Sequence, residues 1–257
     1  MDQVSFLQYS NNDCMDFLRG NLEKSATTIF DTNIFMPLTN ELVFSPSGNG
    51  NARLEELASI FDKAYDYQDK LSELISDSRI IITNDIVKEM VRAQKYWKHR
   101  LNEAELDRRI LNFLKESIRE YASRLTQLYN AFNKDRVASR NDYDINTYYN
   151  FRIFLMQLLE KCYPTRNIST TDKSIIYIMI NKSLSEPTGV ISRDKDLFML
   201  TIEVINNKEE LEKRLKKFDL KVTKKINYKY SNTYILSSNA KRTTTYSRVL
   251  PYSTSNA

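Results

Sequence analysis

The sequence predicts an α/β protein with a central parallel sheet flanked by helices. Short apolar segments rich in β-branched residues at 27–30, 79–83 and 189–192 are typical of strands buried inside a parallel sheet. Segments with helical spacing of apolar residues separate them. Alternation of strands and helices along a chain is typical of parallel α/β architecture.

Length and composition exclude several classes of protein. The 257 residues suffice for one large domain or two small ones. No apolar run approaches the roughly 18–20 residues that span a membrane, and the first residues lack the features of a signal peptide. Two cysteines, Cys14 and Cys162, do not make a disulfide framework. We therefore expect a cytoplasmic protein with no membrane partner.

The scarcity of histidine and glycine narrows the chemistry. The single histidine, His99, argues against a Ser-His-Asp or Cys-His system and against a histidine-rich zinc site. Only four glycines are present, and the Walker and dinucleotide-binding fingerprints are absent. The net charge of +5 and a pI of about 9.0 permit a polyanionic partner without proving one.

The first part of the chain is predicted to hold one helix, one strand and a long second helix. A helix within residues 1–24 has Asn12 or Asp13 as its cap, and a buried strand follows at 27–30 and ends at Asp31. Residues 45–50 read as a flexible loop. Apolar spacing then predicts an amphipathic helix from Leu54 to about residue 78.

The middle of the chain is predicted to be almost wholly helical. No glycine or proline occurs between Gly50 and Pro164, which favours helices broken only by the strand at 79–83. Thr83 or Asn84 caps the next helix. Residues from about 95 to 165 form a helical insertion with a break near 133–144. Basic residues of this insertion could meet a nucleic-acid backbone, but the acidic residues among them favour an ordinary solvated helix face.

The last third is predicted to return to strands and helices. A buried helix begins at Asp172, and a third strand at 189–192 is followed by a fourth at 201–205 and a final helix from Lys208. We expect three regions: an N-terminal helical segment at 1–24, a main domain at 25–219, and a basic, partly disordered extension at 220–257. Residues 229–236 of the extension read as an edge strand.

Acidic residues recur where predicted strands end or helices begin. The five are Asp31, Glu89, Asp172, Asp194 and Asp196. Parallel strands place their carboxyl ends at one edge of the sheet, so these side chains are expected to meet. Clustered carboxylates repel each other unless they bind protons or cations, which implies Mg²⁺ or Mn²⁺. Such ions orient water, lower its pKa and stabilise charge on a phosphoryl group.

The ordered set of acids resembles the PIN-domain ribonuclease family over roughly residues 25–218. The matching segments are a strand followed by D-T-N at Asp31, the helix with Glu89, D-x-x-I-I from Asp172, and S-x-D-x-D from Ser192. The insertion between Glu89 and Asp172 is longer than in compact members, and the extension after residue 220 has no counterpart in the minimal fold.

The resemblance implies a metal-dependent endoribonuclease acting on single-stranded or structured RNA. It implies that Asp31, Glu89, Asp172 and Asp194 hold Mg²⁺ or Mn²⁺, with Asp196 completing the catalytic set. Supporting hydrogen bonds come from three polar residues, and two basic residues are weaker candidates for contact with substrate phosphate. The supporting residues are Thr32, Asn33 and Ser192, and the basic ones are Arg193 and Lys195.

Several alternatives stay open at this point. The fold could serve as a non-catalytic RNA-binding or protein-interaction module, with the acids acting only as helix caps and solvated strand ends. A nuclease of the same fold could cleave DNA. By family resemblance, a toxin or defence role with a cognate inhibitor (antitoxin) protein is plausible, and a homo-oligomer is also open.

Overall fold

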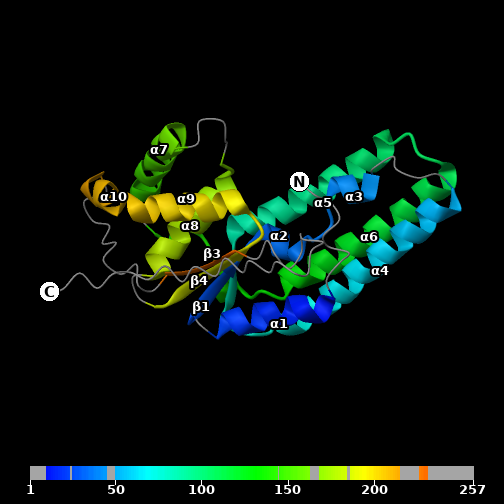
Figure 1. Cartoon of the computed structure of the whole chain (residues 1–257), viewed down its shortest axis with the longest axis horizontal. Helices are drawn as coiled ribbons and strands as arrows, with labels where there is room; N and C mark the ends of the chain where they lie inside the picture. Colours follow the sequence, from blue (N-terminus) through cyan, green and yellow to red (C-terminus); the bar gives the residue numbers. More distant parts are fainter. Residues whose placement is uncertain are drawn as a thin grey trace, which may run out of the picture.

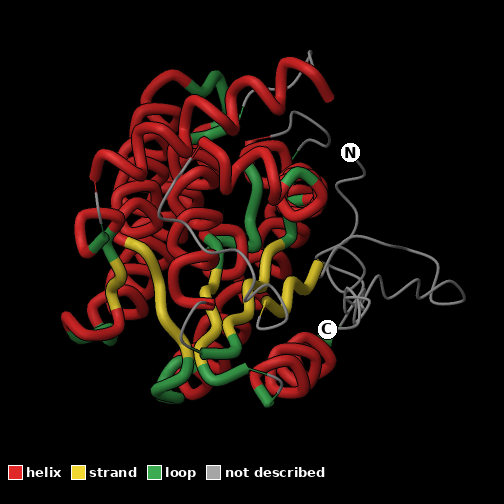
Figure 2. Tube along the Cα trace, turned by 90° about the vertical axis from the view of Figure 1, so that its left-hand side faces the viewer, coloured by secondary structure: helices red, strands yellow, loops and turns green. Residues whose placement is uncertain are grey.

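The computed structural model describes residues 10–23, 25–44, 50–143, 145–162, 168–183, 186–214 and 226–230. Its strands are β1 (Thr27–Phe30), β2 (Ile80–Thr83), β3 (Val137–Ala138), β4 (Thr188–Ser192) and β5 (Ile226–Tyr230). They form one sheet in the order β3-β2-β1-β4-β5, and every pair is parallel. Figure 2 shows these strands side by side with helices packed around them. The predicted α/β class with a parallel, helix-flanked sheet is confirmed.

Helices supply most of the remaining described structure. They are α1 (Asn11–Leu22), α2 (Thr32–Phe35), α3 (Asn40–Phe44), α4 (Asn51–Leu74), α5 (Asn84–Glu103), α6 (Arg108–Asn130), α7 (Ile145–Cys162), α8 (Thr170–Ser183), α9 (Lys195–Asn206) and α10 (Lys208–Arg214), with short 3₁₀ turns at Lys134–Arg136 and Arg140–Asp142. No helix in the described part of the chain combines the length and apolar composition that crossing a bilayer requires.

The central strands are buried on both faces, as their composition predicts. Every residue of β1, β2 and β4 is inaccessible or nearly so. The register pairs Ile29 with Ile81 of β2 and with Val190 of β4, so β1 lies in the middle of the sheet. The helix α8 packs against β4 and is buried on almost every side, in agreement with its apolar sequence.

Three long helices, α4, α5 and α6, run side by side away from the sheet (Figure 1). Aromatic side chains hold them together: Phe61 of α4 packs edge-on against Tyr121 of α6, and Trp97 of α5 stacks on the same tyrosine with ring centroids 5.4 Å apart. The predicted helical insertion therefore exists, although it belongs to the same hydrophobic core as the sheet.

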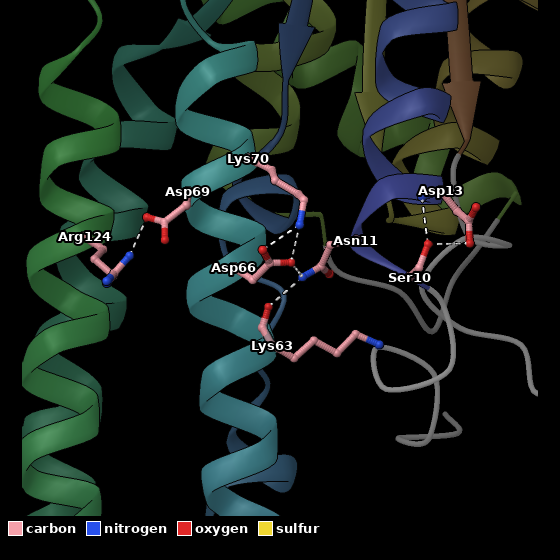
Figure 3. A network of polar contacts seen from close by, with 8 residues as sticks. All are labelled: Ser10, Asn11, Asp13, Lys63, Asp66, Asp69, Lys70 and Arg124. Carbon is pink, nitrogen blue, oxygen red and sulfur yellow. Dashed lines mark hydrogen bonds and ion pairs between the residues drawn. The ribbon is translucent and has the colours of Figure 1, made fainter.

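Polar contacts secure the outer surface of this helical layer (Figure 3). Asn11 of α1 donates to the Lys63 carbonyl and to Asp66 of α4, and Lys70 pairs with Asp66 one turn further on. Arg124 of α6 reaches Asp69 of α4 at 2.5 Å. The ion pairs Lys70–Asp66 and Arg124–Asp69 are partly open to solvent and contribute little to stability, so their main effect is to orient the helices, whereas Asn11 is buried between α1 and α4.

Three local predictions are wrong, and a fourth is correct in kind but begins at a different residue. Residues 201–205 form the last part of α9 and not a fourth strand. Buried Leu197, Leu200, Thr201 and Val204 recur at helical spacing, and this pattern outweighs the strand preference of the isoleucines and valine. The first helix is capped by Ser10, whose hydroxyl accepts from the Asp13 backbone, and not by Asn12 or Asp13.

The other two differences concern strands. The insertion contains a two-residue strand, β3, so helices there are interrupted twice. The predicted edge strand in the extension is present as Ile226–Tyr230, at the edge of the sheet beside β4, but it begins three residues before the predicted 229–236 and lies beyond the expected domain limit at 219. Residues 231–257, the predicted loop at 45–49 and residues 1–9 lie outside the described residues.

Adjacent residues of α4 test how the helical layer is stabilised. Leu71→Ala should lower the free energy of unfolding by about 2–5 kcal/mol, because Leu71 is wholly buried and truncation leaves a cavity. Lys70→Ala should cost no more than about 1 kcal/mol, because its ion pair with Asp66 is exposed. Urea denaturation followed by circular dichroism measures both, and equal losses would contradict this description of the core.

Candidate active site

The strand order creates a switch point between β1 and β4. From β1 the chain continues to β2 and β3 on one side of the sheet, whereas β4 and β5 lie on the other side. Helical connections therefore leave β1 and β4 in opposite directions and a crevice opens at their carboxyl ends, where open α/β sheets bind ligands. Asp31 follows the last residue of β1, and Ser192 is the last residue of β4.

The carboxylate of Asp31 is buried in this crevice and accepts three hydrogen bonds. Its residue is 4% exposed. Oδ1 accepts from the Thr32 backbone N–H at 2.6 Å, which makes Asp31 the N-cap of α2. Oδ2 accepts from Asn33 Nδ2 at 2.7 Å and from Ser192 Oγ at 2.6 Å. The side chain therefore ties the start of α2 to the end of β4.

Asp31 nevertheless binds a proton far more readily than an ordinary carboxyl group. Burial raises its pKa to about 7 from a usual value of 3.8, and the charges of Asp172 and Glu89 raise it further. Hydrogen bonds from Ser192 and Thr32 oppose the shift without cancelling it. Near neutral pH this carboxylate is consequently a group whose charge the protein alone does not fully stabilise.

Asp172 lies at the start of α8 and has a local structural role. Its Oδ2 accepts from Ser169 Oγ at 2.7 Å and from the Ser169 N–H, while Ser169 Oγ accepts from the Asp172 N–H. This reciprocal arrangement is that of a capping box. Burial raises the pKa of Asp172 to about 6, with further contributions from the charges of Asp194 and Glu89. Helix capping explains the position of Asp172 but not its acidic neighbours.

Glu89 and Asp194 complete the group and are connected to Asp31 through other side chains. Thr32 Oγ1 donates to Glu89 Oε2 at 2.7 Å, so α2 holds the glutamate of α5. The Asp194 backbone N–H donates to Ser192 Oγ at 2.9 Å, and that same hydroxyl donates to Asp31. The structure thus brings together four of the five predicted acids from four separate segments.

The remaining predicted residues have different positions. Asn33 bridges the site, because Nδ2 donates to Asp31 and Ser192 while Oδ1 accepts from the Arg193 backbone. Arg193 Nη1 donates back to the Asn33 carbonyl at 3.0 Å. Burial lowers the pKa of Arg193, whereas the nearby Tyr67 and other groups including Asp31 raise it. Its described contacts are with the protein, and they brace Asn33.

Two predicted residues begin α9, directly after this cluster. Lys195 and Asp196 are its first two residues, and their side chains lie outside the described part of the structure. The backbone of α9 nevertheless starts at the same sheet edge, because Asp194 precedes it and contacts Ser192.

The carboxylate oxygens of this cluster suit a hard divalent cation, but in this structure they are not positioned to bind one metal ion together. Within the residues whose placement is described, no three His, Cys, Asp or Glu side chains stand where they could hold a metal ion. The donors are nonetheless carboxylate oxygens, which Mg²⁺ and Mn²⁺ prefer. Burial above all, and then the charges of neighbouring acids, raise the pKa values of Asp31 and Asp172, so a bound cation would favour their ionised forms.

A pocket of about 420 Å³ opens next to this cluster, and the sequence did not predict it. Glu89 contributes to its wall together with Arg92 and Tyr96 of α5, and the segment after α2 forms the opposite side. The only sequence signal for it is the position of Arg92 and Tyr96 three and seven residues after Glu89, which places all three on one helix face.

Comparisons with models of known protein families, with curated proteins and with solved structures return no match.

Asp31 should make stability depend on pH. Because its pKa is about 7 in the folded protein and near 3.8 when unfolded, the folded state retains a proton that the unfolded state releases. Its contribution to stability is therefore complete below about pH 4 and is lost as pH rises toward about 7. Urea unfolding of wild type and Asp31→Asn in EDTA across this range measures it.

The stability of wild type relative to Asp31→Asn should fall steadily over that interval. Asp16→Asn, at an exposed position on α1, serves as a control and should give a difference from wild type that does not change with pH. A pH-independent difference for Asp31→Asn would show that the carboxyl group is not protonated in the folded state.

Proposed function

We propose that this chain is a metal-dependent endoribonuclease of the PIN-domain type. The observation that carries the proposal is the meeting of Asp31, Glu89, Asp172 and Asp194 at the switch point between β1 and β4. Bringing several carboxylates together at a buried position costs electrostatic free energy. A shared cation would offset this cost, whereas a purely structural role would not.

In this proposal the four carboxylates hold Mg²⁺ or Mn²⁺, and other residues orient them. Ser192 and Asn33 fix the plane of the Asp31 carboxylate, Thr32 positions Glu89, and Ser169 positions Asp172. Asp196 follows on α9 and completes the predicted catalytic set. A bound cation would offset the carboxylate repulsion, favour ionisation of the attacking water and neutralise charge developing on the phosphate.

No protein nucleophile is required by this arrangement. Ser192 Oγ donates to Asp31 and accepts from the Asp194 N–H and from Asn33, so its hydrogen bonds are directed at positioning the carboxylate. The sole histidine, His99, is exposed on α5 beside Glu103 and lies several turns away from Glu89. Water is therefore the nucleophile that the site favours, and hydrolysis of a phosphodiester is the reaction.

Cleavage of a mixed-sequence RNA pool with Mg²⁺ or Mn²⁺ tests the proposal. Ser192→Ala should reduce the rate by about 10- to 100-fold, as is typical when a residue that orients a metal ligand is lost. Asp31→Asn and Asp194→Asn should reduce it further, because each removes a ligand. Asp69→Asn, at an exposed carboxylate on α4, should cleave like wild type.

The cleavage assay also separates RNA from DNA as substrate. Single-stranded DNA of matching sequence is the comparison, and a chain that cleaves only DNA would move the proposal to a deoxyribonuclease of the same fold. Equal activity in wild type and both aspartate variants would reject the catalytic assignment.

A second candidate is a non-catalytic RNA-binding or interaction module. This candidate is favoured because the described carboxylates are not positioned to bind one metal ion together. In that case Asp31 and Asp172 would serve only as caps of α2 and α8. A cytoplasmic location remains a proposal that rests on the cysteine content. A toxin or defence role with an inhibitor protein remains a proposal that rests on the family resemblance.

Calorimetric titration with MnCl₂ distinguishes the two functions without an activity assay. The nuclease proposal expects saturable binding at and above neutral pH, with affinity falling as pH drops below about 7, where Asp31 takes up a proton, and further below about 6, where Asp172 does. Asp31→Asn should weaken this binding strongly, and Asp69→Asn should leave it unchanged. Heats that never saturate, or that persist in Asp31→Asn, would support the non-catalytic module.

A further inference from the structure

The pocket beside Glu89 lies between α5 and the segment that follows α2. Met36, Leu38 and Thr39 line one side, and the α5 residues Arg92, Tyr96 and Trp97 line the other. Phe44 of α3 packs edge-on against Trp97, which keeps α3 alongside α5 (Figure 1). A volume of about 420 Å³ falls within the range of sites that bind small organic groups.

One face of α5 leads from the acidic cluster through this pocket. Glu89, Arg92, Tyr96 and Arg100 are spaced three, seven and eleven residues along the helix, which places them on one stripe about 16 Å long. The acidic end of the stripe belongs to the candidate active site. Beyond Glu89 the stripe carries Arg92 and Tyr96, which line the pocket, and then Arg100 past the pocket, whose guanidinium lies 5.8 Å from the centroid of the Phe44 ring. Arginine and aromatic side chains are those that bind phosphates and stack on bases.

Two residues of the pocket, Arg92 and Tyr96, are open to solvent. Within the described residues Arg92 makes no hydrogen bond or ion pair, whereas Arg79, Arg124 and Arg214 are all paired with carboxylates. Tyr96 is 47% exposed. The stacked pair Trp97–Tyr121 supports α5 from behind, so the exposed ring stands on a rigid helix.

We infer that this stripe is a binding site for single-stranded RNA leading into the active site. A base of the strand stacks on Tyr96, and Arg92 and Arg100 bind phosphates on either side of it. The inference rests on the proposed nuclease function for the identity of the polymer. Base stacking on an exposed tyrosine requires an unpaired base, so a double helix does not fit the site in the same way.

The stripe also explains how an acidic active site could attract RNA, which is negatively charged. The four carboxylates alone repel a phosphodiester, and the side chain of Arg193, which follows β4, is directed at Asn33. Arg92 lies one helical turn from Glu89 and faces the pocket. Positive charge next to the acidic cluster attracts the strand and leaves the cluster itself for the cation.

Fluorescence anisotropy with a labelled mixed-sequence RNA of about 12 nucleotides tests the inference in EDTA, where no cleavage occurs. Tyr96→Ala should weaken binding by about 5- to 150-fold, because one stacked base is lost. Tyr96→Phe should restore it, since the ring remains. Arg92→Gln should reduce the slope of log affinity against log salt by about 0.7, as expected for one lost phosphate contact.

Matched controls make the result decisive. Arg19 is an exposed arginine of α1 that lies beside the residues preceding β2, at the edge of the sheet opposite the acidic cluster. The Arg19→Gln variant should therefore bind RNA like wild type. An RNA duplex of the same strand should show no dependence on Tyr96. Unchanged binding in Tyr96→Ala, or an equal loss in Arg19→Gln or for the duplex, would overturn the inference.

The experiment separates failure of this site from failure of the nuclease proposal. Tyr96-dependent binding without any Asp31-dependent cleavage would reject the nuclease and leave the stripe as a single-strand binding site. Asp31-dependent cleavage with Tyr96→Ala binding and cutting like wild type would leave the nuclease and reject the stripe.

Discussion

The buried carboxylate of Asp31 must be held by groups from two sides of the sheet's central crevice. Its two oxygens accept hydrogen bonds from the start of α2 and from the end of β4, and no part of the side chain depends on solvent for these contacts. Burial disfavours the charged form of this carboxylate more than the hydrogen-bond donors favour it, so its pKa is raised to about 7. The positions of Asn33 and Ser192 follow from this one requirement, and Arg193 then braces Asn33.

Each acid of the cluster is reasonable by itself, and only their combination is unusual. Asp31 caps α2, Asp172 forms a capping box with Ser169, and Glu89 accepts from Thr32. Capping alone could be performed by serine or asparagine with no repulsion between segments. The protein instead retains four carboxylates within electrostatic reach of each other, which is the kind of local cost that functional sites carry.

Strands that are buried on both faces were predicted correctly from the sequence. Segments whose structure depends on pairing with a distant strand, or on helical spacing of core residues, were not. The strands at β1, β2 and β4 were predictable because a parallel sheet buries both faces and so requires continuous apolar residues. The two-residue β3 carries no such pattern. At 201–205 the β-branched residues favoured a strand, but Val204 faces the core together with Leu197 and Leu200, as only a helix permits.

The candidate site was predictable to the level of the sheet edge and no further. Acids that follow parallel strands must gather there, but their partners depend on side-chain directions that spacing does not encode. Asn33 turned out to bridge Asp31, Ser192 and the Arg193 backbone, and the Arg193 side chain was directed into the protein. The pocket beside Arg92 forms where Met36, Leu38 and Thr39, in the segment after α2, meet α5, and this contact is not encoded in the spacing of the α5 residues.

The hydrogen bond between Ser192 and Asp31 joins residues 161 positions apart. Contacts of this length form late, because a large loop must close before β4 can dock beside β1. During synthesis, domains acquire structure as the chain emerges from its N-terminus. A ribosome-bound chain that has exposed Asp31, Glu89 and Asp172 but not yet β4 therefore has no assembled crevice. The crevice at this edge therefore cannot assemble before about three-quarters of the 257 residues, up to Ser192, have been made.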